Sequence, residues 1–146
     1  MPGNLISQRP SISREEKLYL LTSASVLALS DLPEERSLAY EIAARIIETS
    51  VEDPSLISAS IFIMSRLGNF PGRELAIKRF FHDSTSIADH PLLAIESIAR
   101  EVGNTVQVAG QSCTLTDFQI DFFSILEKSD SASISAPTSA GKSFVL

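Results

Sequence analysis

A short run near the C-terminus has the residue types and spacing of a phosphate-binding loop. Ala136 is followed after four residues by Gly141-Lys142-Ser143, which fits the loop pattern with Ala in place of its first glycine. In that pattern backbone N–H groups surround a phosphate, and a helix then begins with its positive end towards the anion. Gly141 would let the backbone approach closely, Lys142 would reach the β- and γ-phosphates, and Ser143 would ligate Mg²⁺. The candidate nucleotide-binding residues of this loop are Thr138, Ser139, Ala140, Gly141, Lys142 and Ser143.

The residues before the loop must supply a strand if the loop is to hold a phosphate. Ser131 to Ser135 is a small, polar run around Ile134, and we interpret it as that strand. The alternative is that the whole end of the chain is a flexible tail rich in Ser and Gly. Because the other strands of the parallel sheet that would hold this strand are not encoded here, we expect residues 131–146 to be poorly protected from amide exchange or held by a neighbouring molecule.

A second motif lies upstream at a separation that gives the loop more weight. Gln119 precedes Lys142 by 23 positions and follows Asp117-Phe118. The segment from Leu115 to Val145 resembles the start of the first RecA-like domain of superfamily 2 helicases. It is most similar to the DExH and Ski2-like groups, which carry an Asp-x-Phe-Gln-like stretch and then an Ala-Pro-Thr-Ser-Ala-Gly-Lys-Thr-like loop. Those groups show the same separation between the two motifs.

The resemblance implies a nucleotide site with ATP and Mg²⁺ as cofactors, in which Gln119 reads the adenine. Members often place an aromatic residue six positions before the glutamine, where it stacks on the base, and this chain has Cys113 there. The acidic motif, the second RecA-like domain and its arginine fingers do not occur in these 146 residues. Because phosphoryl transfer needs all of them in place, we expect the chain by itself not to hydrolyse ATP and to hold no catalytic residue.

Composition allows one domain and part of another. The chain has 44% hydrophobic residues and a net charge of −6, so it can form a core, and we expect its general affinity for nucleic acid to be weak. A single cysteine excludes an internal disulfide and fits a protein of the reducing cytoplasm. No apolar run has the length of a membrane span, and no secretory signal is visible, so we expect no membrane partner.

Five helices are predicted before residue 105. Ser13 is a candidate N-cap of a helix that ends near Ser30, and Asp31 to Glu35 and Asp53-Pro54 start the second and third helices. The third is apolar nearly all round between residues 56 and 67, which is typical of a central helix. Pro71-Gly72 is interpreted as a turn before a fourth helix over residues 73–81. Pro91 opens the fifth, whose apolar face is formed by Leu92, Ile95, Ile98, Ala99 and Val102.

The chain changes character after Asn104. Thr105 to Val108 alternates like a short strand, Gly110-Gln111-Ser112 is interpreted as a loop, and a helical segment then runs to Lys128. The predicted fold is mainly α: an irregular helical bundle followed by the first helix, strand and phosphate loop of an incomplete RecA-like α/β domain. The predicted divisions are an extended lead-in over 1–12, an accessory helical domain over 13–104 and the RecA-like start over 105–146.

Two other groups of residues invite a functional interpretation. His82-Asp83 and Asp89-His90 could bind a divalent metal, but their spacing fits no ligand pattern, and roles in loops and caps are favoured. A local basic patch could contact a nucleic-acid backbone. A surface neutralised by acidic neighbours is the favoured interpretation of that patch. Its residues are Arg66, Arg73, Lys78 and Arg79.

Two function classes follow from the sequence. The first is the front end of an ATP-dependent superfamily 2 helicase or translocase, with the helical domain as a docking or regulatory surface for a protein partner. DNA and RNA both remain open as substrates. The pathway also stays open among genome defence of the Hachiman type, RNA processing and DNA repair. The second is a non-enzymatic helical interaction module with a non-functional loop-like tail.

Overall fold

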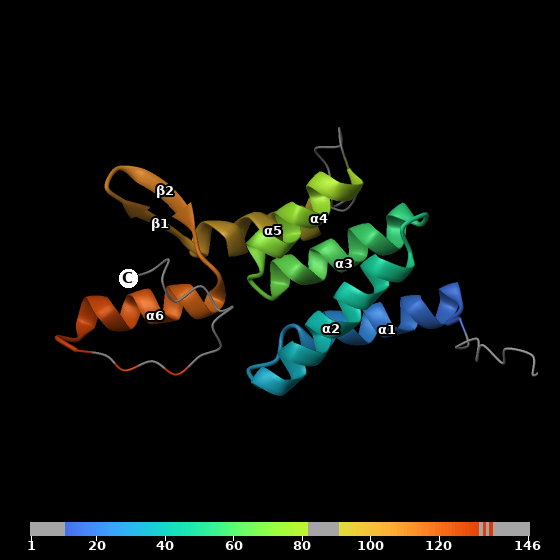
Figure 1. Cartoon of the computed structure of the whole chain (residues 1–146), viewed down its shortest axis with the longest axis horizontal. Coiled ribbons are helices and arrows are strands. Elements are labelled where there is room, and N and C mark those ends of the chain that lie inside the picture. Colours follow the sequence, from blue (N-terminus) through green and yellow to red (C-terminus); the bar gives the residue numbers. More distant parts are fainter. Residues whose placement is uncertain (1–10, 82–90, 132, 134, 136–146) are drawn as a thin grey trace, which may run out of the picture.

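The computed structural model describes residues 11–81, 91–131, 133 and 135, and these residues form six helices and one two-stranded sheet (Figure 1). The elements are α1 (Arg14–Leu27), α2 (Pro33–Thr49), α3 (Pro54–Arg66), α4 (Phe70–Phe80), α5 (Pro91–Gly103), β1 (Thr105–Val108), β2 (Gln111–Thr114) and α6 (Asp117–Lys128). The mainly helical class predicted from the sequence is confirmed. The predicted loop residues from Thr138 to Ser143 and the segment from His82 to His90 lie outside the described residues.

The main apolar core lies among α1, α2, α3 and α4. Its central helix is α3, as predicted, because Ile57, Ile61 and Ile63 are almost completely buried. The small residues Ala39 and Ala43 of α2 let the neighbouring helices approach closely. The buried members of this core are Leu21, Ala24, Ala28, Ala39, Ala43, Ile46, Ile47, Leu56, Ile57, Ile61, Ile63, Met64 and Ala76.

The predicted starts of α1 and α3 are confirmed by their caps. The Ser13 hydroxyl accepts from the Glu16 amide, and the Glu16 carboxylate accepts from the Ser13 amide, which forms a reciprocal capping box. Asp53 caps α3 by accepting from the amides of Ser55 and Leu56, and Pro54 follows it at the first helical position. Both helices therefore begin directly after the cap residue that the sequence predicted.

The start of α4 was predicted wrongly. We expected Pro71-Gly72 to be a turn before a helix at Arg73, whereas α4 begins at Phe70 and includes both residues. The Asn69 side chain caps this helix by accepting from the Gly72 amide at 3.1 Å. Pro71 is compatible with the first turn of a helix because its missing N–H would have no helical partner there.

The fifth helix, α5, directs its apolar face to solvent, the opposite of ordinary amphipathic packing. Its apolar residues Leu92, Ile95, Ile98 and Val102 are between 61% and 68% exposed, and none of its residues is fully buried. Its polar face instead meets α3 and α4. The periodicity of the sequence defined the apolar face of α5 correctly, but that face does not contribute to the core.

Two strands form an antiparallel hairpin after α5. Thr105 pairs with Thr114 and Val108 pairs with Gln111, so the turn is Ala109-Gly110. The φ angles of Ala109 (51°) and Gly110 (83°) are both positive, which is the geometry of the favoured two-residue hairpin turn. The prediction of a strand over residues 105–108 is therefore confirmed, and the prediction that Gln111 and Ser112 form a loop is wrong.

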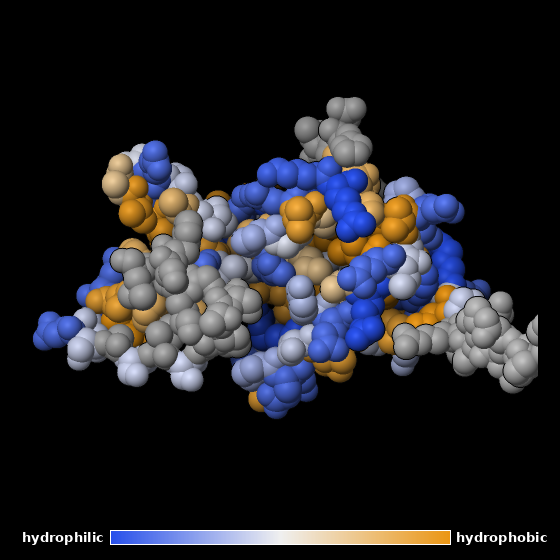
Figure 2. All heavy atoms as spheres, viewed as in Figure 1, coloured by the Kyte–Doolittle hydropathy of each residue, from blue (hydrophilic) through white to orange (hydrophobic). Residues whose placement is uncertain are grey.

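The hairpin and α6 lie at one end of the molecule, away from α1 (Figure 1). In the face shown in Figure 2, hydrophilic side chains cover much of the surface, and apolar side chains are also visible on the hairpin and α6. Ser131, Ser133 and Ser135, the described residues of the predicted strand before the loop, are exposed and belong to no strand. The sheet of the described residues is only the hairpin, so the RecA-like domain remains a prediction.

Candidate functional site

The first turn of α6 carries the one predicted nucleotide-binding residue that the structure describes, Gln119. Its side chain is 8% exposed, and its Oε1 accepts from the Thr116 amide at 2.9 Å. The Thr116 hydroxyl accepts in return from the Gln119 amide at 3.3 Å. This capping box fixes the carboxamide relative to the start of the helix. Because the loop residues lie outside the described part, no distance relates Gln119 to Lys142.

The neighbouring Asp117 is the centre of a polar cluster that the sequence did not predict. Its Oδ2 accepts from Nη2 of Arg36 at 2.5 Å and from Nη2 of Arg100 at 2.6 Å. Its Oδ1 accepts from Nδ2 of Asn104 at 2.9 Å. All these hydrogen bonds have an ionised carboxylate as acceptor, and two also have a cationic donor, so they belong to the strong class.

The arginines of this cluster also donate to backbone carbonyls at the C-terminal ends of two helices, α1 and α3. Arg36 donates to the carbonyls of Ala28 and Leu67, which follow α1 and α3. Arg100 donates to the carbonyl of Arg66, at the last residue of α3. Cations are favourable at helix C-termini because the last carbonyls lack partners and carry partial negative charge. The cluster therefore joins α1, α2, α3 and α5 to the first turn of α6.

Close packing of the backbone accompanies these ion pairs. Gly68 follows α3 with φ of +67°, and the amides of Gly68 and Asn69 donate to the carbonyls of Ser65 and Met64, which is the Schellman ending of a helix. A side chain at position 68 would overlap the Asp117 carboxylate. The first turn of α6 thus lies directly against the end of α3.

The predicted basic patch is mostly neutralised inside the structure. Arg66 pairs with Glu96 and its guanidinium lies over the Phe62 ring, while Arg73 pairs with Glu101. Both arginine side chains are largely buried, so they are not available to a nucleic-acid backbone. The interpretation that acidic partners neutralise the patch is confirmed for Arg66 and Arg73, although they are buried between helices and not exposed.

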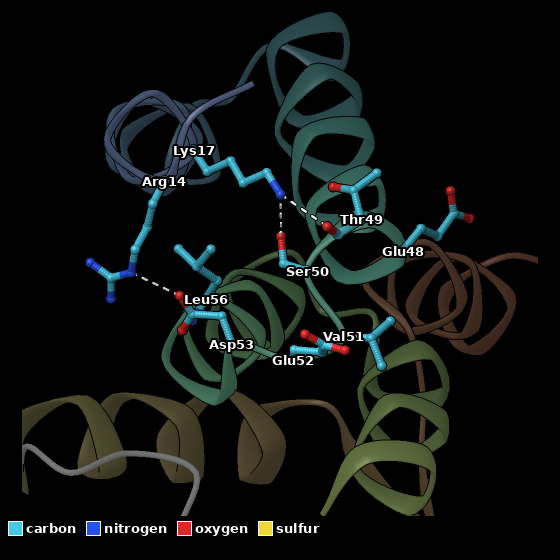
Figure 3. A pocket seen from close by; sticks show the side chains of 9 residues that line it. All are labelled: Arg14, Lys17, Glu48, Thr49, Ser50, Val51, Glu52, Asp53 and Leu56. Carbon is cyan, nitrogen blue, oxygen red and sulfur yellow. Dashed lines mark hydrogen bonds and ion pairs between the residues drawn. The ribbon is translucent and has the colours of Figure 1, made fainter. Parts of the chain in front are cut away.

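An open hollow of about 430 Å³ lies where α1 meets the turn between α2 and α3 (Figure 3). Arg14 points to Asp53 with an N–O distance of 2.8 Å, and Nζ of Lys17 donates to the Thr49 carbonyl and the Ser50 hydroxyl at 2.9 Å each. The Arg14 hydrogen bond lowers the pKa of the Asp53 carboxyl, which is also an N-cap. The basic side chains of Arg14 and Lys17 hold α1 against the turn between α2 and α3. The hollow is lined by Arg14, Lys17, Glu48, Thr49, Ser50, Val51, Glu52, Asp53 and Leu56.

Metal binding has no candidate within the part of the chain that the structure describes. No group of three or more His, Cys, Asp or Glu side chains is gathered there. The predicted weak metal candidates His82, Asp83, Asp89 and His90 and the predicted Mg²⁺ ligand Ser143 lie outside it. Cys113 lies half-buried in β2 opposite Val106.

The sequence contained a signal for one part of this site. Thr116-x-x-Gln119 is the spacing of a capping box, which could have placed the helix start without any family resemblance. The contact between Asp117 and Arg36 joins residues 81 positions apart, and local patterns carry no information about it.

Comparisons with known proteins returned no match from family models, curated proteins or solved structures. Among the described helices, none combines the length and apolar character needed to cross a membrane.

Proposed function

We propose that the chain is the N-terminal part of an ATP-dependent superfamily 2 nucleic-acid helicase or translocase. In this proposal residues 13–104 are an accessory helical domain, and residues 105–146 begin the ATPase domain. Gln119 reads the adenine, the loop from Thr138 to Ser143 surrounds the phosphates, and Ser143 holds Mg²⁺ in the assembled site. DNA or RNA would bind through further helicase domains, and the helical domain would dock a protein partner or regulate the ATPase.

The observation that carries this proposal is the pairing of two motifs at a separation of 23 positions. In the structure Gln119 lies in the first turn of α6, is 8% exposed, and accepts from the Thr116 amide through its Oε1. A base-reading side chain benefits from such a fixed orientation, since less conformational freedom is lost on binding. The expected inactivity of the isolated chain stays part of the proposal.

The proposal is tested by titrating the isotope-labelled chain with Mg²⁺-ATP and recording amide chemical shifts. We expect the amides of Gly141, Lys142 and Gln119 to shift together, and Lys142→Ala to weaken binding by about tenfold or more because it removes the cation that meets the phosphates. Lys128→Ala, at the exposed end of α6, is the matched control. In a longer protein that contains this chain, Lys142→Ala should abolish ATP hydrolysis.

Shifts confined to other residues, or equal binding by Lys142→Ala and the control, would reject the nucleotide site.

A second candidate function is a helical interaction module whose tail binds no nucleotide. The observation that favours it is the exposed apolar face of α5, formed by Leu92, Ile95, Ile98 and Val102. An exposed apolar face on a helix is a common feature of partner-binding surfaces. The Mg²⁺-ATP titration separates the candidates, since this module predicts no shift at Gly141 or Lys142 at any nucleotide concentration.

A further inference from the structure

Charged hydrogen bonds join the first turn of α6 to α2 and α5. Leu115 and Phe122, the buried apolar residues around α6, do not belong to the core of α1 to α4. Arg36 of α2 and Arg100 of α5 both donate to the Asp117 carboxylate in the first turn of α6. That carboxylate is thus a point at which α2 and α5 both meet the first turn of α6.

The charges around Asp117 explain why both arginines are needed. The carboxylate lies beside the C-terminal end of α3, where the last carbonyls carry partial negative charge and would repel it. Arg36 and Arg100 each donate both to a carbonyl at that end and to Asp117, so each cation bridges two groups that would otherwise repel. The side chains of the three ionised residues are between 27% and 36% exposed, so water screens the bridge only in part.

Asn104 extends the same connection to the hairpin. Its side chain is buried and donates to both Asp117 Oδ1 and the Leu115 carbonyl, while the Leu115 amide donates back to the Asn104 carbonyl. These bonds join the residue before β1 to the residue after β2, next to the start of α6. A displacement of α5 would be transmitted to the first turn of α6 through Arg100 and Asn104 together.

The same turn contains Gln119, two residues after Asp117. The capping box fixes the Gln119 carboxamide to the helix start, and Asp117 fixes the helix start to α2 and α5. We propose that Asp117 is a positioning residue through which the helical domain sets the orientation of the Gln119 carboxamide, and so the preference of the nucleotide site for adenine over other bases. This inference rests on the proposed function for its ligand, and the attachment of α6 can be tested without it.

The first measurement needs no nucleotide. Asp117→Asn keeps the shape of the side chain and removes its charge, and Asp121→Asn makes the same change on the exposed face of the same helix. We expect amide hydrogen exchange at Gln119 and Ile120 to become about tenfold faster in Asp117→Asn. Exchange at Ile61, in the core, should stay unchanged, and Asp121→Asn should match the wild type throughout.

The second measurement compares the affinities of the same variants for fluorescent ATP and GTP analogues. A residue with a purely structural role would change both affinities equally. We expect Asp117→Asn to lower the ratio of ATP to GTP affinity by about threefold or more, with the GTP affinity nearly unchanged, because the phosphates are held elsewhere. Arg100→Gln removes one of the two bridging cations and should shift the ratio in the same direction if Asp117→Asn proves too unstable to measure.

The outcomes separate this inference from the function it rests on. Unchanged exchange in both Asp117→Asn and Arg100→Gln would overturn the attachment. An unchanged nucleotide ratio in a wild-type protein that prefers ATP would overturn the positioning role. A wild-type chain that binds neither nucleotide would overturn the proposed function and the base-setting role with it, while the exchange data would still decide whether Asp117 attaches α6.

Discussion

Arg66 and Glu96 form a two-pronged ion pair between α3 and α5. Nε of Arg66 lies 2.5 Å from Oε1 of Glu96, and Nη2 lies 2.9 Å from Oε2. The remaining Nη1 of Arg66 donates to the carbonyl and hydroxyl of Ser25 in α1. One guanidinium thus connects three helices, and it replaces the apolar contact that would ordinarily hold an amphipathic helix such as α5.

Replacing Glu96 by Gln should weaken the attachment of α5 to α3. The variant keeps the size of the side chain but leaves the Arg66 cation, which is largely buried, without its carboxylate. We expect the free energy of unfolding to fall by about 1–2 kcal/mol, since hydrogen bonds to charged groups contribute more than neutral ones. Urea denaturation measures the change, with Glu127→Gln on the exposed face of α6 as the control. Equal stability of the two variants would contradict this role for the pair.

The same pair predicts a loss of stability in acid. The Arg66 hydrogen bond, aided by nearby charge, lowers the pKa of Glu96 below its ordinary value of 4.5. A carboxyl group with a lowered pKa in the folded protein stabilises it fully above the unfolded pKa, and this contribution is lost as the pH falls through the folded pKa. The difference in thermal midpoint between the wild type and Glu96→Gln should therefore be constant near neutral pH and shrink below about pH 4.5. A difference that grows in acid would refute the assignment.

The reversed packing of α5 predicts unequal responses to the same substitution. Ile61 is completely buried in α3, so Ile61→Ala should cost about 2–5 kcal/mol through lost burial and a residual cavity. Ile98 lies on the exposed face of α5, and Ile98→Ala should change stability by less than about 0.5 kcal/mol. Calorimetry of the two variants tests this, and a large loss for Ile98→Ala would mean that its face is covered in solution.

The cap of α6 can be tested apart from Asp117. Thr116→Ala removes the hydroxyl that accepts from the Gln119 amide, and we expect a loss of about 1 kcal/mol in stability together with fraying of the first turn. Ser129→Ala, at the opposite end of α6, serves as the control because it alters no N-terminal cap. Circular dichroism and urea denaturation would record both changes. Identical helicity in the two variants would show that the hydroxyl is not needed.

The sequence predicted features that depend on neighbours within a few positions. Ser13 and Asp53 marked helix starts correctly because a cap bonds only to the next turn. Pro71 misled the prediction because proline is accepted both in turns and in the first turn of a helix, and only Asn69 as the cap distinguishes them. The caps at Ser13 and Asp53 were therefore predicted correctly, but the start signal over Asp31 to Glu35 gave no side-chain cap, because Leu32 occupies the N-cap position of α2. Local patterns are also weaker where one residue suits two conformations.

The direction in which α5 faces could not be predicted, because it is decided by distant partners. The spacing of Leu92 and Ile95 shows that they share a face. The polar face of α5 turns inward because its acidic side chains pair with Arg66 and Arg73, which lie about thirty positions earlier in the chain. The Asp117 cluster was missed for the same reason. The phosphate-binding loop around Lys142 remains a prediction from the sequence motif alone.

The contact of Gly68 with Asp117 implies a constraint on how this sequence can change over evolutionary time. A Cβ at position 68 would occupy the space of the Asp117 carboxylate, and the positive φ already disfavours other residues. A lineage that replaces Gly68 must shorten or move the side chain at 117, and Arg36 and Arg100 would then lose their shared acceptor. We expect descendants of this chain to keep or to change the residues at positions 36, 68, 100 and 117 together. The residue at one of these positions would then predict the residues at the other three.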